Sequence, residues 1–201
     1  MSAMGPEGWN ERYEKSDLIW GAAANRTLVS EVGTMVRGRA LDLGCGEGRN
    51  AVWLARQGWT VTGVDFSEVG LEKGRRLAEA EGVTVEWELA DLRTYTPAAD
   101  AYHLVVVLYL HLPADERRSV HAAAAAALRA GGAIIVLGHD ESNLTDGYGG
   151  PQDAAILFTP EDVVEDLAGL SVVKAERVAR RVSTDAGVRS AIDALVRAVR
   201  L

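Results

Sequence analysis

From about residue 39 the chain alternates short apolar segments with longer amphipathic ones. Leu104 to Leu108 is a continuous apolar run, which is typical of a strand covered on both faces. Strands that alternate with helices of about a dozen residues predict a parallel α/β sheet. The expected strands are 40–43, 59–65, 83–89, 102–109 and 133–137, and the expected helices are 50–57, 68–80, one from Pro113 through the alanines 122–127 to Gly131–Gly132, and one that opens at Thr159–Pro160.

The two ends of the chain depart from this alternation. Residues 172–179 and 189–199 predict two strands joined directly through 183–187, which makes them a β-hairpin. Residues 1 to about 36 contain several glycines that interrupt any long helix, and only 9–15 and 23–36 are expected to be helical. We therefore divide the chain into an N-terminal segment, 1–36, and a main domain, 37–201.

Composition narrows the class of protein. A chain of 201 residues, 48% hydrophobic and 25% charged, fits one globular domain. Its 29 acidic and 21 basic residues give a net charge of −8, which disfavours nucleic-acid and membrane partners. One cysteine excludes an internal disulfide, and neither a signal peptide nor a membrane-spanning run is evident. We expect a cytoplasmic enzyme or binding protein and leave its oligomeric state open.

The first strand ends in a glycine-rich turn, Gly44-x-Gly46-x-Gly48, that opens a helix. Open α/β sheets bind ligands at such a turn. A P-loop would need a terminal Gly-Lys-Ser/Thr, and a dinucleotide site would need glycine where Arg49 stands. Asp42 precedes the turn and Glu47 lies within it. Two carboxylates repel a pyrophosphate and attract an ammonium group, although Asp42 could merely cap the strand end and Glu47 could equally face solvent.

Two further acidic residues follow the next strands. Asp65 ends the second strand, where an acid accepts hydrogen bonds from both hydroxyls of an adenosine ribose. Asp91 follows the third strand and is placed to accept from an adenine amino group, and Phe66 can lie against the base. Either acid could instead be an ordinary turn residue. A ribose site, an adenine site and an ammonium site without a phosphate cradle together predict S-adenosylmethionine (SAM) as the cofactor.

The segments Leu41–Asn50 (LDLGCGEGRN), Val64–Ser67 (VDFS) and Ala90–Leu92 (ADL) resemble the class I SAM-dependent methyltransferase family. The resemblance covers about residues 39–139. It implies an α/β, Rossmann-like seven-stranded sheet with strand order 3-2-1-4-5-7-6, strand 7 antiparallel, and helices on both faces. The chain departs from the family at Tyr102-His103, where Phe-Asp is common and structural.

The Gly-Arg-Asn sequence at 48–50 and the short N-terminal segment resemble the small tellurite-resistance-type branch of that family. By that resemblance, residues 1–36 form a helical lid over the cofactor and 37–201 form the SAM-binding domain. Cys45 is expected to fit the tight turn rather than to act as a nucleophile. The implied cofactor-binding residues are Asp42, Gly44, Cys45, Gly46, Asn50, Asp65, Phe66, Asp91, Leu92 and Leu108, together with Trp9 and Tyr13, which could also simply pack in their helix.

Candidate catalytic residues follow the fourth and fifth strands, at one edge of the sheet. Tyr109 and His111 come after the fourth strand, and His139 follows the fifth, with Asp140 next to it. A histidine can remove the proton of a hydroxyl acceptor near neutral pH, so His139 with Asp140 is the expected general base. Tyr109, His111 and His139 could each also be packing residues. The remaining expectations are a structural His103, a surface His121, and packing roles for Trp53, Trp59 and Trp87.

The methyl acceptor is the least defined part of the prediction. The loop 138–150 is rich in polar side chains, which suits a small hydroxylated substrate such as a sugar and predicts O-methylation. A thiol, selenite or tellurite acceptor is the alternative that the branch resemblance implies. A catalytically inactive SAM-binding protein and a dinucleotide oxidoreductase are the other classes. No metal site is expected, because three consecutive residues such as 139–141 rarely converge on one ion.

Overall fold

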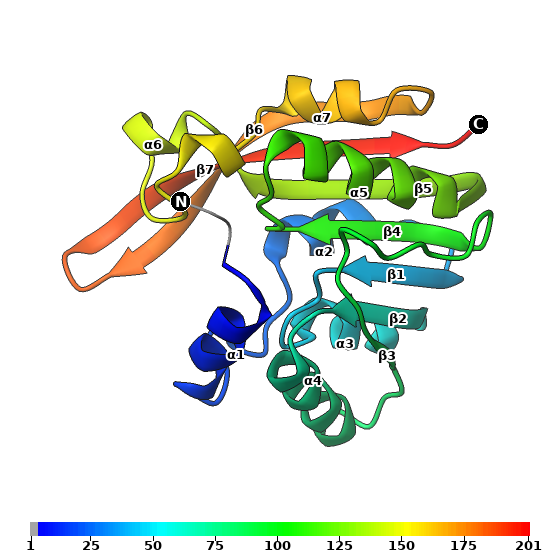
Figure 1. Ribbon diagram of the computed structural model, residues 1–201, viewed down its shortest axis with the longest axis horizontal. Helices are drawn as coiled ribbons and strands as arrows, with labels where there is room; N and C mark the ends of the chain where they lie inside the picture. Colours follow the sequence, from blue (N-terminus) through cyan, green and yellow to red (C-terminus); the bar gives the residue numbers. More distant parts are fainter. Residues whose placement is uncertain (1–3) are drawn as a thin grey trace.

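A computed structural model describes residues 4–201, and it contains one seven-stranded sheet flanked by helices (Figure 1). The strands are β1 (Arg39–Leu43), β2 (Thr60–Asp65), β3 (Glu86–Leu89), β4 (Tyr102–Leu108), β5 (Leu128–His139), β6 (Ser171–Thr184) and β7 (Gly187–Val199). The helices are α1 (Pro6–Glu14), α2 (Arg26–Val32), α3 (Arg49–Arg56), α4 (Glu68–Ala80), α5 (Ala114–Ala127), α6 (Asn143–Asp146) and α7 (Pro160–Asp166), with a short 3-10 helix η1 (Ala154–Ile156).

The strand order is β3-β2-β1-β4-β5-β7-β6, which confirms the order implied by the resemblance. Strands β1 to β5 pair in parallel, whereas β7 is antiparallel to both β5 and β6. The chain proceeds from β1 to β2 and β3 on one side, then continues with β4 and β5 on the other side of β1. Connections therefore diverge above the carboxyl ends of β1 and β4, where open α/β sheets bind ligands.

Hydrophobic clusters cover the two faces of the sheet. One cluster includes Val105 and Ile134 and packs against α5 and α7. The other includes Leu104 and Ile135 and packs against α2, α3 and α4. Adjacent residues of one strand enter opposite clusters because successive side chains alternate in direction. Helices therefore lie on both faces, as expected.

Trp87 of β3 packs on three glycines. A β-carbon at Gly74 of α4 would lie 2.7 Å from the indole, and β-carbons at Gly48 and Gly63 would also meet this ring. Such contacts are shorter than van der Waals separation, so the indole fills space that glycine alone leaves. Trp87 is a packing residue, as predicted, and it brings β3, β2, α4 and the glycine-rich turn together.

The alanine-rich helix ends earlier than predicted. α5 stops at Ala127, where the backbone amides of Asp100 and Ala101 donate to the carbonyls of its last two residues. Leu128 is already extended and begins β5. The predicted end at Gly131–Gly132 is wrong, because hydrogen bonds from a distant segment close the helix before the glycines are reached.

Strand β3 is shorter than the predicted 83–89 and begins only at Glu86. Gly82 has φ of +66°, and the amide of Val83 donates to the carbonyl of Ala78 at 3.0 Å. This bond terminates α4 in the way that a left-handed glycine commonly does. Val83 therefore takes part in ending the helix, although the alternation of residues 83–89 predicted that a strand begins there.

The N-terminal helices are also displaced from the predicted 9–15 and 23–36. α1 begins earlier, at Pro6, since proline is favoured in the first turn of a helix. α2 begins at Arg26, because the side chain of Asn25 accepts from the amides of Thr27 and Leu28 and so caps the helix.

The C-terminal hairpin is confirmed and is longer than predicted. Asp193 of β7 pairs with His139, the last residue of β5, so residues 187–192 continue beyond the end of that strand. Figure 1 shows the hairpin projecting past the carboxyl ends of β4 and β1, on the same side as α1 and α6. It therefore borders the edge at which the candidate site lies.

His121 is buried, and the expected surface position is wrong. Its side chain is 2% exposed, and its Nδ1 lies 2.9 Å from a carboxylate oxygen of Asp166. Arg117, one turn earlier in α5, donates to the same carboxylate through Nε at 2.7 Å. This buried cluster of Arg117, His121 and Asp166 joins α5 to α7. The expectation failed because the partner carboxylate lies far away in sequence.

His103 has a structural role, as predicted. It lies in β4 next to the start of β1, and its Nδ1 accepts a hydrogen bond from the amide of Arg39 at 3.2 Å. Its Nε2 lies 2.9 Å from the guanidinium of Arg129. The residue that replaces the common aspartate therefore still ties β4 to its neighbours.

Candidate active site

The glycine-rich turn joins β1 to α3 beside the carboxyl end of β2. Gly44, Gly46 and Gly48 have φ of +74°, +53° and +77°, which L side chains rarely adopt. The amides of Gly44 and Cys45 donate to the carbonyl of Val64 at 2.9 and 3.1 Å, which fixes the turn to β2. Cys45 is buried, and burial raises the pKa of its thiol, so the thiol stays protonated and unreactive.

Asp42 of β1 holds a carboxylate that lacks a full set of partners. The residue is 1% exposed, and its Oδ2 has no hydrogen-bond partner among residues 4–201. Burial, followed by the charge of Asp65, raises the pKa of Asp42 to about 7. Because an unpaired buried carboxylate is costly, the site is suited to a cationic hydrogen-bond donor. An ammonium group fits this chemistry and a phosphate does not.

Because the pKa of Asp42 is raised, ligand binding is expected to be coupled to release of a proton from Asp42. Binding the ammonium of S-adenosylhomocysteine should ionise Asp42 and release about half a proton per site at pH 7. Affinity should then fall as the pH is lowered below 7, because protonated Asp42 no longer pairs with the cation. Calorimetry in buffers of different ionisation enthalpy measures the released proton. Proton release that persists in Asp42→Asn would assign the effect to another group.

Asp65, at the end of β2, is held by backbone groups on both sides. Its Oδ2 accepts from the amide of Gly46 at 2.8 Å, and its Oδ1 accepts from the amide of Ser67 at 2.8 Å. Burial raises its pKa despite these two bonds. Each carboxylate oxygen can accept a second hydrogen bond, so Asp65 keeps capacity for ribose hydroxyls while it orders the turn.

The expected base-binding residues lie at the next strand end. Asp91 is partly exposed and forms a two-pronged ion pair with Arg93, which lowers the pKa of its carboxyl group. Leu92 is buried, with its side chain 3.8 Å from where a β-carbon would stand on Gly44. Phe66 is half-buried after β2, and Leu108 is buried at the end of β4. Arg93 therefore competes with the expected adenine amino group for the Asp91 carboxylate. The sequence analysis did not consider this ion pair.

Glu47 is buried, so the solvent-facing alternative is wrong. Its carboxylate is 2% exposed and accepts from the amides of Ile19 and Trp20 at 3.2 and 3.4 Å. The ammonium of Lys73 lies 3.2 Å from the same carboxylate. Glu47 thus attaches the N-terminal segment to the glycine-rich turn.

Asn50 has a similar tethering role. Its side-chain oxygen accepts from the amide of Asn25 at 2.9 Å. Asn25 in turn caps α2 and donates to the hydroxyl of Tyr109 at 3.3 Å. The asparagine that was expected to bind cofactor therefore uses its oxygen to position the chain that leads into α2.

The helix α1 lies over the glycine-rich turn. Tyr13 is 5% exposed, and its hydroxyl would be 2.6 Å from a β-carbon placed on Gly46. Trp9 is half-buried with its ring centroid 5.4 Å from that of Tyr13. Asn10 accepts from the hydroxyl of Ser67 at 2.6 Å, which ties α1 to the start of α4. Tyr13 therefore lies against the turn, and Trp9 packs beside Tyr13.

Tyr109, His111 and His139 form one aromatic cluster at the carboxyl ends of β4 and β5. The rings of His111 and His139 stack with centroids 5.3 Å apart, and Tyr109 lies 5.2 Å from His139. Tyr109 has φ of +56°, an uncommon value for a bulky residue and a form of strain that clusters at functional sites. His111 Nδ1 lies 3.3 Å from the carbonyl of Ile156, and its buried Nε2 has no partner among the described residues.

The carboxylate beside His139 is Asp193 and not the expected Asp140. One carboxylate oxygen of Asp140 accepts hydrogen bonds from the amide and hydroxyl of Ser142 and from Arg177. That oxygen is therefore bonded to groups other than the His139 imidazole. Asp193 Oδ1 instead lies 3.3 Å from His139 Nδ1. The sequence analysis did not identify Asp193, because only strand pairing brings it next to His139. The one sequence feature that could have indicated a functional role is that Asp193 is the lone acidic residue in the apolar strand 191–199.

Two arginines near this cluster were also missed. Arg180 of β6 donates to Asp193 through Nε at 2.7 Å and lies over the ring of Tyr109 at 5.5 Å. Arg49, half-buried at the start of α3, donates to the carbonyl of Trp20 at 3.0 Å. Burial lowers the pKa of Arg49, and the nearby carboxylate of Asp42 opposes that change. Its guanidinium therefore lies within electrostatic range of both the turn and the aromatic cluster.

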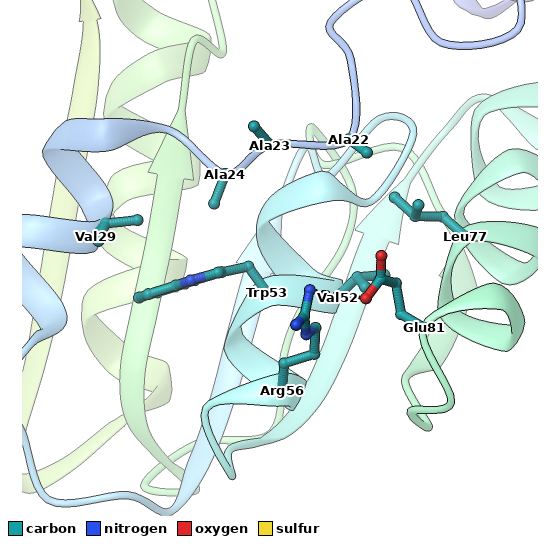
Figure 2. A pocket seen from close by; sticks show the side chains of 9 residues that line it. All are labelled: Ala22, Ala23, Ala24, Val29, Val52, Trp53, Arg56, Leu77 and Glu81. Carbon is teal, nitrogen blue, oxygen red and sulfur yellow. Dashed lines mark ion pairs between the residues drawn. The ribbon is translucent and has the colours of Figure 1, made fainter.

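A separate hollow lies along α3, and Figure 2 shows its lining. Its volume is about 230 Å³, and it is lined by Ala22, Ala23, Ala24, Val29, Val52, Trp53, Arg56, Leu77 and Glu81. None of these is a candidate site residue, and Arg56 and Glu81 form an ion pair at 2.7 Å. Within residues 4–201 no helix is long and apolar enough to cross a bilayer. Nor do three metal-ligating side chains converge in that part of the chain.

Comparison with known proteins points to one family. Residues 40–132 match the family model described as a methyltransferase domain. The 2-heptyl-1-hydroxyquinolin-4(1H)-one methyltransferase of Mycobacteroides abscessus is 28% identical over 119 residues, which cover 58% of this chain and 52% of that protein. The chain thus spans about half the length of this curated relative.

Solved structures share the whole fold. The structure described as "Conversion of a Disulfide Bond into a Thioacetal Group during Echinomycin Biosynthesis" has a TM-score of 0.79 at 22% identity, covering 97% of this chain and 91% of the other. TehB from Haemophilus influenzae has a TM-score of 0.74 at 18% identity, covering 98% and 67%. At these identities the likeness concerns the fold.

The strand order with an antiparallel β7, together with a glycine-rich turn beside an unpartnered carboxylate, defines a SAM-dependent methyltransferase fold. Residues 40–132 match the methyltransferase-domain model, and the fold is that of the class I SAM-dependent methyltransferases, whose cofactor is S-adenosylmethionine.

Proposed function

We propose that this protein transfers a methyl group from SAM to an oxygen atom of a small polar acceptor, with His139 as general base. The observation that carries the proposal is the cluster of Tyr109, His111 and His139 at the carboxyl ends of β4 and β5. β4 adjoins β1, which bears Asp42, and β5 is the next parallel strand, so the base lies at the same sheet edge as the expected ammonium site.

The cofactor would be held by residues of the turn and the strand ends. Asp42 would pair with the ammonium group, and the glycines would let the backbone approach the carboxylate near the start of α3. Asp65 would accept from the ribose hydroxyls, and Asp91 and Phe66 would face the adenine. Cys45, Leu92 and Leu108 would line the apolar side, and Asn50 would keep the approach to α2 in place. When bound, SAM supplies an electrophilic methyl group on a sulfonium.

Positioning and proton removal are then the tasks of the protein. Alignment of the acceptor oxygen with the methyl carbon can supply about 7–11 kcal/mol of the barrier. The oxygen forms its bond to this carbon as the carbon–sulfur bond breaks, and its proton passes to His139. The imidazolium afterwards releases that proton to solvent. A base of this kind contributes roughly 10²–10⁴-fold to the rate.

His139 is favoured over His111 as the base. Burial, and then the charge of His139, lower the pKa of His111 to about 4, so His111 is neutral and weakly basic near pH 7. Its unpartnered Nε2 can accept a hydrogen bond from the acceptor. Burial and the charge of Asp193 raise the pKa of Tyr109, which therefore keeps its proton and serves in orientation.

The N-terminal segment, of which the structure describes residues 4–36 and not residues 1–3, is proposed to be a lid over the cofactor. It is held around the glycine-rich turn by contacts that involve the side chains of Glu47, Lys73, Asn10 and Asn50. Tyr13 covers Gly46. Closure of the segment would exclude water from the methyl group, which suits a reaction that water would otherwise intercept. The acceptor would enter beside the polar loop 138–150, where Gly150 closely approaches the ring of His139.

Replacing His139 with alanine should lower kcat about 10²–10⁴-fold with hydroxyl acceptors, because the proton has no internal base. Affinity for S-adenosylhomocysteine, measured by calorimetry, should stay near that of the parent protein. Turnover is measured with labelled SAM and a panel of sugars and phenols. His103→Ala serves as the matched control, since His103 lies at the opposite end of β4. Full activity of His139→Ala on a hydroxyl acceptor would remove His139 from the mechanism.

A sulfur, selenium or tellurium acceptor is the second candidate. The likeness to a structure concerned with conversion of a disulfide into a thioacetal favours it. A thiolate carries no proton to remove, so such a reaction should proceed in His139→Ala at a nearly unchanged rate. Thiol and selenite arms of the same acceptor panel therefore distinguish the two chemistries. Labelled SAM that binds without transfer to any acceptor would indicate a SAM-binding protein without activity.

A further inference from the structure

We infer that Asp193 is a positioning residue of the acceptor site, which holds His139 in the tautomer with Nδ1 protonated and Nε2 free to take a proton. The inference rests on the proposed function, in which His139 is the base, and it adds a His–Asp pair built across β5 and β7. Asp193 itself is not expected to touch the acceptor.

The burial of Asp193 shows that it must be partnered. The residue is 0% exposed, in the middle of a strand whose neighbours Ala191, Ala194 and Leu195 are also fully buried. A carboxylate in such surroundings persists only when it is paired or hydrogen-bonded. Burial disfavours its ionised form, but the neighbouring His139 imidazole and hydrogen bonds from Arg180 and Tyr109 lower the pKa of Asp193, so it is a carboxylate at neutral pH.

Its neighbours come from β5, from β6 and from the residue that follows β4. The hydroxyl of Tyr109, after β4, donates to Oδ2 at 2.7 Å, and Nε of Arg180 in β6 donates to the same oxygen at 2.7 Å. Oδ1 lies 3.3 Å from Nδ1 of His139, directly across the β5–β7 pairing. The hydrogen bonds from Tyr109 and Arg180 fix the carboxylate, so the imidazole meets a rigid acceptor.

The pairing determines which nitrogen of His139 carries the proton. Nδ1 is buried and forms no hydrogen bond with any described residue, and the Asp193 carboxylate 3.3 Å away is the acceptor placed to meet it. A carboxylate can only accept, so a neutral imidazole satisfies it by presenting Nδ1–H. The lone pair is then on Nε2, as a general base requires. The distance is that of a ligand-free site, in which catalytic hydrogen bonds are often long and tighten with substrate.

Every charged or titratable group around His139 is compatible with this assignment. His111 stacks on it and is neutral near pH 7, because burial lowers its pKa to about 4. Tyr109 is uncharged and occupied with Asp193, and Arg180 is neutralised by the same carboxylate. Asp193 is thus the only anion within the described structure that contacts the imidazole, and it would stabilise the imidazolium that forms during transfer.

The decisive measurement is the tautomer of His139, which requires no acceptor. The chain has four histidines, so ¹⁵N-histidine labelling gives few signals, and His139→Gln assigns those of His139. With S-adenosylhomocysteine present, we expect a protonated Nδ1 and an unprotonated Nε2. Asp193→Asn should abolish that preference, whereas Asp140→Asn, the matched change next to His139, should leave it intact. An Nε2-protonated His139 in the parent protein would overturn the inference even if no variant folds.

The rate measurement separates positioning from a merely structural role. Asp193→Asn should lower kcat roughly 10²-fold, at the lower end of what a general base contributes, with unchanged affinity for S-adenosylhomocysteine. The rising limb of kcat against pH should move to lower pH, because loss of the anion disfavours the imidazolium. A lower kcat with the pH limb and the tautomer unmoved would assign Asp193 a structural role. Full activity of His139→Ala would instead refute the proposed function, while the tautomer still reports on Asp193.

Discussion

Replacing Asp42 with asparagine is expected to lower the affinity for S-adenosylhomocysteine by roughly 30- to 1,000-fold, or about 2–4 kcal/mol, which is typical of a removed partner in a buried charge pair. The amide has nearly the same shape, so the turn should keep its conformation. The loss arises because the Oδ2 atom, unpartnered within residues 4–201, is the group we assign to the ligand's ammonium.

The same substitution should not destabilise the protein. The pKa of Asp42 is raised to about 7, so the folded protein holds a proton that the unfolded chain releases. Stability is therefore lost as the pH rises from about 4 to 7, and Asp42→Asn should remove this pH dependence. Lower affinity with an equal or higher Tm at pH 8 is the expected combination. Asp100→Asn, an exposed acid before β4, is the control. Unchanged affinity in Asp42→Asn would show that the ammonium binds elsewhere.

Replacing Asp166 with alanine should cost about 3–5 kcal/mol of unfolding free energy, as expected when one partner is removed from a buried ion pair. Arg117 is 7% exposed and His121 is 2% exposed, so both would keep polar groups in the core without their carboxylate. Urea unfolding followed by circular dichroism measures the loss. The affinity for S-adenosylhomocysteine should not change at temperatures where the variant is folded, because the cluster lies between α5 and α7.

Asp115→Ala is the matched control for this effect. Asp115 and Arg118 also form an ion pair on α5, but the aspartate is 93% exposed. Exposed pairs of this kind contribute about 0–1 kcal/mol. If Asp166→Ala cost no more than Asp115→Ala, the buried cluster would be replaceable and its geometry would not hold the two helices together.

The parts of the fold that follow from local chemistry were predictable from the sequence. The apolar runs of β4 and β5 identified strands, and Ser67 and Thr159 marked the starts of α4 and α7 through their caps. The strand order itself came from the resemblance, since pairing of distant strands has no local signal. Element ends were less accurate where remote groups decide them, as when the amides of Asp100 and Ala101 terminate α5.

The candidate site divides in the same way. The glycine-rich turn and Asp42 are contiguous in sequence, and their chemistry could be predicted from their order. Glu47 was not interpretable, because its partners Ile19 and Trp20 belong to a segment whose position depends on tertiary structure. Proximity in the chain suggests Asp140 as the partner of His139, whereas the β5–β7 register places Asp193 opposite it.

The contact of Trp87 with three glycines has a consequence for how this protein can vary. A β-carbon at Gly48, Gly63 or Gly74 collides with the indole, so an alanine at any of these positions is compatible only with a smaller residue at position 87. The four positions therefore constrain one another across separate segments of the chain. Substitution of any of the three glycines would have to follow substitution of Trp87 by a smaller residue. Engineering of the proposed nucleoside-binding region should therefore change the four positions together.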